Sequence, residues 1–224
     1  MLFLPISYFR ASEIIRNKKI LPIRISPRHA LLGITVFDFI DCPVGPYREL
    51  ALTVPVSTKN YPYGPNVLPL LFPKKLSQYF ALYTILLAMS TSHGREHASQ
   101  MFGYPVYKNT LDINFELTDK NISVEVEDSG IKILAFEKHI NSRFSTHKRF
   151  YRTIFPADEA LNLVELSAST IESSHYMHRL TNFYIGKHPI SNQVMDLSPS
   201  IFSLQTSVYK KATETLSIPR KLQI

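Results

Sequence analysis

The sequence predicts a mainly β (α+β) fold, in which one antiparallel-rich sheet closes into a single β-barrel with a few short helices. Short segments that alternate between apolar and polar residues, or that are rich in β-branched and aromatic residues, recur along the chain, whereas long helical patterns are few. The 15 prolines are spread between these segments. A length of 224 residues suits one barrel, and no repeat or linker divides the chain, so we expect one domain over 1–224.

The clearest strand signals lie in the middle of the chain. Residues 110–117 alternate between apolar and polar side chains, residues 121–127 repeat the pattern, and a turn at 128–130 leads into a return strand at 131–137. Further strands are expected at 30–40, 47–57, 147–154, 161–172 and 180–185.

Three segments bear on the helices. Residues 76–89 are so apolar that they fit a buried strand or a helix. Short helices are expected at 11–19, with Ser12 as the N-cap, and around 91–101. The tail from residue 199 is expected to contain another short helix before Pro219.

Composition excludes several classes of protein. The net charge of +7 comes from scattered lysine pairs with no long basic run and no RRM, KH or zinc-finger pattern, so we expect no nucleic-acid partner. A cavity for anionic substrates would explain the same charge. Cys42 is the only cysteine, which forbids an intrachain disulfide and fits a reducing cytoplasm. The most apolar stretch, 81–89, is about half a membrane span, so no membrane partner is expected.

The chain contains few other short patterns of the kind that form functional sites. His93-Gly94-Arg95-Glu96-His97 matches His-x-x-Glu-His, but Gly94 weakens the helix and no third ligand motif follows, so we expect no metal. No phosphate loop, dinucleotide fingerprint or nucleophile elbow is present, and we expect no cofactor. A cluster of basic side chains either lines an anionic pocket or forms a polar loop between strands; its members are His139, His147, Lys148 and Arg149.

Three short segments carry a resemblance to a known family. They are Gly45-Pro46-Tyr47-Arg48-Glu49-Leu50 followed by Val54-Pro55-Val56; Thr91 to Lys108, with Phe102-Gly103-Tyr104-Pro105 inside it; and Gly186-Lys187-His188-Pro189-Ile190 followed by Leu197. In this order they resemble the acetoacetate decarboxylase-like family. The resemblance implies a cone-shaped β-barrel with an internal cavity for a small keto or carboxylic acid, and a homo-oligomer.

The resemblance also implies a lysine directly after the Gly-aromatic-Pro turn, which forms an imine with a β-keto acid. Here that position is Val106, followed by Tyr107. Lys108 lies two residues further on, and in an extended segment it would share a face with Val106. Either Lys108 replaces the missing amine, or it is an exposed lysine at a strand end.

The remaining site residues follow from the same resemblance. Glu49 matches the cavity glutamate and is the candidate acid or base. The second cavity glutamate has no clean counterpart, Thr35 and Asp38 being the nearest. Substrate-binding roles are expected for Arg10, Tyr47, Tyr104, Val106 and Gln100. Three functions stay open: a decarboxylase-like enzyme, in the class of lyases; a non-catalytic protein that binds a small molecule on the same barrel; and, on weaker grounds, a basic module that interacts through its surface.

Overall fold

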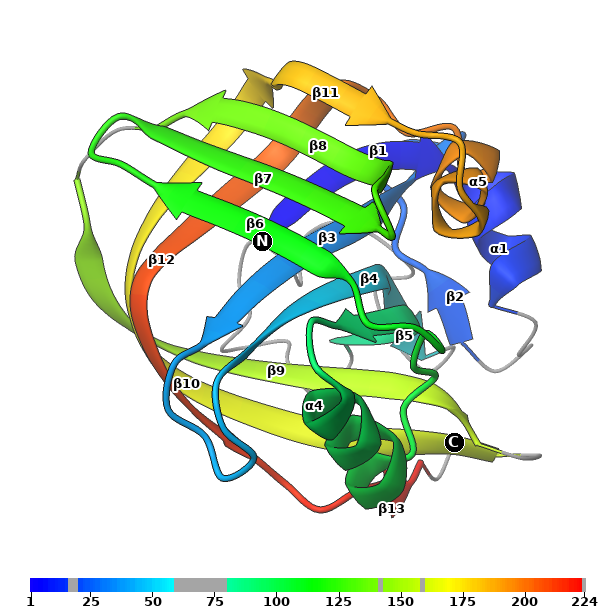
Figure 1. Cartoon of the computed structure of the whole chain (residues 1–224). Helices are drawn as coiled ribbons and strands as arrows, with labels where there is room; N and C mark the ends of the chain where they lie inside the picture. The colour runs from blue at the N-terminus through cyan, green and yellow to red at the C-terminus, as the bar shows by residue number, and fades with distance from the viewer. Residues whose placement is uncertain (16–19, 59–79, 141–142, 158–159, 223–224) are drawn as a thin grey trace.

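The computed structural model describes residues 1–15, 20–58, 80–140, 143–157 and 160–222. Seven of its strands close into a barrel in the order β1-β3-β4-β5-β9-β10-β12, because β12 pairs with both β10 and β1 (Figure 1). The barrel strands are β1 (Leu2–Ser7), β3 (His29–Phe39), β4 (Tyr47–Thr58), β5 (Phe80–Met89), β9 (Ser145–Ala157), β10 (Ala160–Arg179) and β12 (Phe202–Leu216). Neighbours in the barrel run antiparallel except β5 and β9, which are parallel.

A second, four-stranded sheet covers one side of the barrel (Figure 1). Its strands are β6 (Asp112–Leu117), β7 (Asn121–Asp128), β8 (Ile131–His139) and β11 (Thr181–Ile185). Two short strands, β2 (Ile20–Pro22) and β13 (Arg220–Lys221), pair with β4 and β10. The helices are α1 (Tyr8–Ile14), α4 (Ser92–His97), the π-helical turn η2 (Ala98–Phe102) and α5 (Pro189–Asp196).

The alternation of β4 shows how the two faces of the barrel wall differ. Leu50, Leu52 and Val54 are buried in the same cluster as Ile113 and Val124 of the second sheet, so this set lies on the outer, covered face. Successive strand residues point to opposite faces, and Glu49, Ala51 and Thr53 therefore face the barrel interior. That interior face is the one that carries the polar side chains discussed below.

Most of the predicted strands are confirmed. The strands expected at 30–40, 47–57, 110–137 and 180–185 appear within one or two residues. The ambiguous segment is strand β5 from Phe80 onward; residues 76–79 lie outside the described part of the chain.

Three expectations were wrong or incomplete. The tail is not a helix: β12 is a strand of 15 residues that closes the barrel through partners far away in sequence. Helix α1 begins at Tyr8 and is capped by Ser7, whereas the Ser12 hydroxyl donates to the Tyr8 carbonyl at 2.9 Å. Residues 16–19 of that predicted helix lie outside the described part. Strand β1 was not predicted.

Within the described residues, the helices are all too short or too polar to cross a lipid bilayer.

Candidate functional site in the barrel interior

Glu49 lies on the inward face of β4, near the start of that strand. It is paired with Phe37 of β3 and Met89 of β5, and residues directly opposite in a sheet share a face. The Glu49 side chain is half-buried and is flanked by these two apolar side chains. No described group hydrogen-bonds to it. Burial raises the pKa of Glu49 to about 8, and the negative charge of Glu214 adds to the rise.

Glu214 comes from β12, across the barrel, where it lies opposite Ala168 of β10. Burial also raises its pKa. Sequence reasoning missed this residue because it lies in the tail that was expected to be helical. The Glu214 carboxyl thus adds to the effect of burial on Glu49, and at neutral pH Glu49 holds a proton.

Two tyrosines accompany these carboxyls. The Tyr104 hydroxyl lies 2.6 Å from the Thr153 hydroxyl, and its ring packs on Phe155 at 4.2 Å between centroids. Burial raises the pKa of Tyr104 to about 12, with a contribution from Glu49. Burial and then Glu49 also raise the pKa of Tyr47. Both phenols therefore remain protonated at neutral pH and can donate hydrogen bonds.

Val106 occupies the position where the resemblance expects the amine. It forms a parallel bridge with Leu87 and packs against the cluster of Ala51, Leu87 and Met89, which lies beside Glu49. Tyr47 and Tyr104 contact the same cluster. The structure thus brings Glu49, Tyr47, Tyr104 and Val106 together, with an apolar side chain where the imine-forming lysine would stand.

The segment that carries Val106 is held in place from both sides. Gly103 ends η2 with φ of 69°, a left-handed conformation that glycine adopts without strain. The Leu87 amide donates to the Pro105 carbonyl at 3.0 Å, and the Tyr107 amide donates to the Leu87 carbonyl at 2.7 Å. The Tyr107 side chain points the other way and donates to Asp128 at 2.9 Å.

The Gly-x-His-Pro motif supports this segment from the second sheet. His188 caps α5, and its other ring nitrogen lies 3.3 Å from both the Asp128 carboxylate and the Tyr107 hydroxyl. Gly186 is required because a Cβ there would lie 1.8 Å from the Lys132 carbonyl oxygen. The motif therefore acts on the site through Tyr107, by fixing the backbone next to Val106.

Three other predicted site residues lie outside this cluster. Lys108 is exposed, and its carbonyl accepts a hydrogen bond from Arg95. Arg10 is exposed on α1 and pairs with Glu13 at 3.2 Å. Gln100 is exposed on η2.

Of the two positions considered for the second glutamate, only Thr35 faces the interior. Thr35 is buried and pairs with Ala51, which places the two on one face. Asp38 is exposed and pairs with Arg48 at 3.3 Å. As for metals, the described residues contain no group of three or more potential His, Cys, Asp or Glu ligands.

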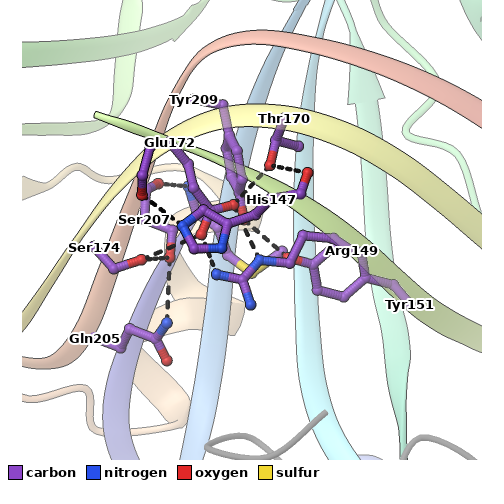
Figure 2. Close-up of polar contacts among 11 residues, drawn as sticks. His147, Arg149, Tyr151, Thr170, Glu172, Ser174, Gln205, Ser207 and Tyr209 are labelled. Atoms are coloured by element: carbon purple, nitrogen blue, oxygen red, sulfur yellow. Dashed lines mark hydrogen bonds and ion pairs between the residues drawn. The ribbon is translucent and has the colours of Figure 1, made fainter. Parts of the chain in front are cut away.

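A second polar cluster lies on the inward faces of β9, β10 and β12 (Figure 2). Arg149 forms an ion pair with Glu172 through two hydrogen bonds, one of 3.0 Å from Nε and a shorter one from Nη2. Glu172 also accepts from Thr170 at 2.9 Å, and its side chain is 1% exposed. The hydroxyls of Tyr151 and Tyr209 are 2.9 Å apart. The sequence singled out Arg149 but not its partner.

The described chain is thus a closed β-barrel, covered on one side by a second sheet, with ionisable side chains on its inward face. The sequence and the structure were compared with those of known proteins. No protein-family model matches the sequence, and none of the curated proteins matches it. Among solved structures, acetoacetate decarboxylase from Legionella pneumophila is similar, with a TM-score of 0.61 and 12% identity over 99% of this chain and 84% of that chain.

Two further structures give the same result. MppR, an enduracididine biosynthesis enzyme in complex with pyruvate, has a TM-score of 0.61 and 11% identity over 99% of this chain and 87% of that chain. An acetoacetate decarboxylase-like enzyme from Sphingomonas wittichii has a TM-score of 0.53 and 9% identity over 99% and 89%. The chain therefore has the acetoacetate decarboxylase-like fold, as the sequence resemblance predicted.

Proposed function

We propose that this protein binds a small keto or carboxylic acid inside the barrel, and that Glu49 exchanges a proton with it. The observation that carries the proposal is the Glu49 carboxyl: it faces the interior, lacks a hydrogen-bond partner among the described residues, and has a pKa raised to about 8. A pKa near the working pH suits a group that both gives and takes a proton.

The chemistry proposed here differs from imine catalysis. Val106 has no amine, so a keto acid at this position cannot be activated as an imine by that residue. The phenols of Tyr47 and Tyr104 can instead donate hydrogen bonds to the ligand's carbonyl or carboxylate oxygen, because their raised pKa values keep them protonated. The ionised fraction of Glu49 would then remove a proton from the carbon next to the carbonyl, and the protonated carboxyl would return it.

The structural neighbours support the substrate class. MppR is described in complex with pyruvate and with a condensation product of pyruvate. Pyruvate is a small keto acid with exchangeable protons next to its carbonyl, so it is a suitable probe for the present chain. The keto-acid assignment rests on the shared fold together with the position of Glu49.

Glu49→Gln is expected to abolish catalysed proton exchange. Pyruvate or acetoacetate is incubated with the protein in D₂O, and loss of the protons next to the carbonyl is followed by NMR. The wild type should exchange faster than the buffer control, and Glu49→Gln should lower the enzyme-dependent rate by about 100-fold or more, as for other general acids and bases. Glu13→Gln, which changes an exposed glutamate on α1, is the matched control and should retain the wild-type rate.

The second candidate function is a non-catalytic binding protein, and the absence of an amine at Val106 favours it. Saturable binding of the acid without enhanced exchange would support this function and contradict proton transfer by Glu49. Imine formation by Lys108 is a third proposal, in which Arg10 and Gln100 would assist with binding. It requires a borohydride-trapped adduct on Lys108, which Lys108→Arg should prevent.

We also propose that the protein is a cytoplasmic homo-oligomer. Light scattering of the purified protein tests its assembly.

A further inference from the structure

The cluster around Arg149 lies at a different level of the barrel from Glu49. Strands β5 and β9 run parallel, and Leu82 is aligned with Thr153. Glu49 lies beside Met89, at the end of β5, and thus at the level where β9 also ends. Arg149 lies near the start of β9. The Arg149 cluster is therefore displaced along the barrel from Glu49, and the Glu214 carboxyl is close enough to both regions to contribute to the raised pKa values of Glu49 and of Tyr151.

A pocket of about 390 Å³ opens beside this cluster, and we call it the arginine pocket. Its volume is within the range of small-molecule sites, about 300–1,000 Å³. Its lining residues are Arg143, Ser145, His147, Arg149, Glu172, Ser173, Ser174, His175 and Tyr176. Two guanidinium groups, two imidazoles and several hydroxyls thus face one carboxylate.

That carboxylate is already satisfied by the protein. Arg149 donates to Glu172 through Nε and Nη2, Thr170 donates as well, and the pair is largely withdrawn from solvent (Figure 2). Nη1 of Arg149 takes no part in the ion pair. The two hydrogen bonds to Glu172 fix the orientation of the guanidinium group and therefore the direction in which Nη1 points. Arg143 is exposed and makes no ion pair with the described residues. The donors of the pocket therefore exceed its acceptors.

A buried positive charge lies behind the pocket wall. The Lys138 side chain on β8 is 2% exposed, and its amine has no hydrogen-bond partner among the described residues. It is close enough to His175, which lines the pocket, to help lower the pKa of that imidazole, after the larger effect of burial. A buried ammonium without a counter-charge is unfavourable. An anion in the pocket would offset this cost.

We propose that the arginine pocket binds the phosphate or carboxylate group of a small organic anion, with Arg143 and Nη1 of Arg149 as the main donors. The hydroxyl groups of Ser145 and Ser174 are already engaged with His147 and with Glu172 and Ser207, so the two guanidinium groups supply the free donors. The volume exceeds that of an inorganic phosphate, so an organic part is accommodated as well. The site does not depend on the proposed chemistry at Glu49.

Calorimetric titration of four probes tests this proposal: inorganic phosphate, glycerol 3-phosphate, malonate and, as the uncharged control, glycerol. We expect at least one of the three anions to bind and glycerol not to bind; the anion preferred shows whether phosphate or carboxylate is recognised. Arg143→Gln should weaken that binding at least tenfold. Arg28→Gln removes one exposed positive charge outside the pocket and should stay within about twofold of the wild type.

Two further variants distinguish the site from alternatives. Lys138→Met should weaken anion binding at least threefold without lowering the melting temperature of the free protein, because it removes a buried charge and keeps the bulk. Glu49→Gln should leave anion affinity unchanged. The proposal is overturned if no anion binds, if Arg28→Gln weakens binding as much as Arg143→Gln, or if Glu49→Gln abolishes it.

Discussion

Arg149→Met is expected to lower the free energy of unfolding by about 3–5 kcal/mol, because it leaves a buried carboxylate without its partner. Glu172 is almost completely buried, and two of its hydrogen bonds come from the Arg149 guanidinium. The other donors, Thr170 and Ser174, are neutral and do not compensate a full negative charge. Urea denaturation at pH 7, followed by circular dichroism, measures the loss.

The double variant Arg149→Met/Glu172→Gln is the matched control. With the charge of Glu172 removed as well, most of the lost stability should return, since an uncharged amide costs less to bury than an ionised carboxylate. A loss below about 1 kcal/mol for Arg149→Met, or a double variant no more stable than the single one, would show that the ion pair contributes little.

Val106→Lys is expected to give the barrel an imine-forming amine. Val106 packs against Ala51, Leu87 and Met89, and an amine in such an apolar setting is held partly neutral, which allows it to attack a carbonyl. Incubation with acetoacetate or pyruvate followed by borohydride should add the mass of the reduced ligand to the variant. Peptide mapping should place the adduct at position 106.

Val106→Met serves as the control, because methionine is similar in length and has no amine. It should give no adduct at position 106. The wild type should also give none there. If Val106→Lys folds normally, binds the acid and is still not trapped, then the side chain at 106 does not point at the ligand, and the placement of the site beside Val106 is incorrect.

The strands that have one buried face and one exposed face were predictable from the sequence. Residues 110–137 have one face on the core and one face in solvent, so their alternation gave three strands with nearly correct ends. Strand β5 is buried on both faces, which removes the alternation and leaves helix and strand indistinguishable. Strand β12 is stabilised by pairing with β1 and β10, and no local pattern reports partners so far away.

The site was predictable only in part, for related reasons. Short motifs led to Glu49, Tyr104 and Val106, which lie on neighbouring segments of the interior. Glu214 was missed together with its strand. Glu172 was missed because its pairing with Arg149 depends on the register of β9 against β10, which sets the two side chains diagonally across the hairpin. Lys108 was expected to follow the face of Val106, but the chain bends at residues 108 and 109 and exposes it.

The proposed binding of a small acid beside a protonated Glu49 is tested most directly by the pH dependence of pyruvate binding. The protonated carboxyl donates a hydrogen bond to the ligand's carboxylate, whereas the ionised form repels it. Calorimetric titrations of the wild type from pH 6 to pH 9.5 should show constant affinity up to about 8 and then a fall of roughly tenfold per pH unit. Glu49→Gln should remove this fall. Affinity that does not change with pH in the wild type, or that falls equally in Glu49→Gln, would contradict the claim.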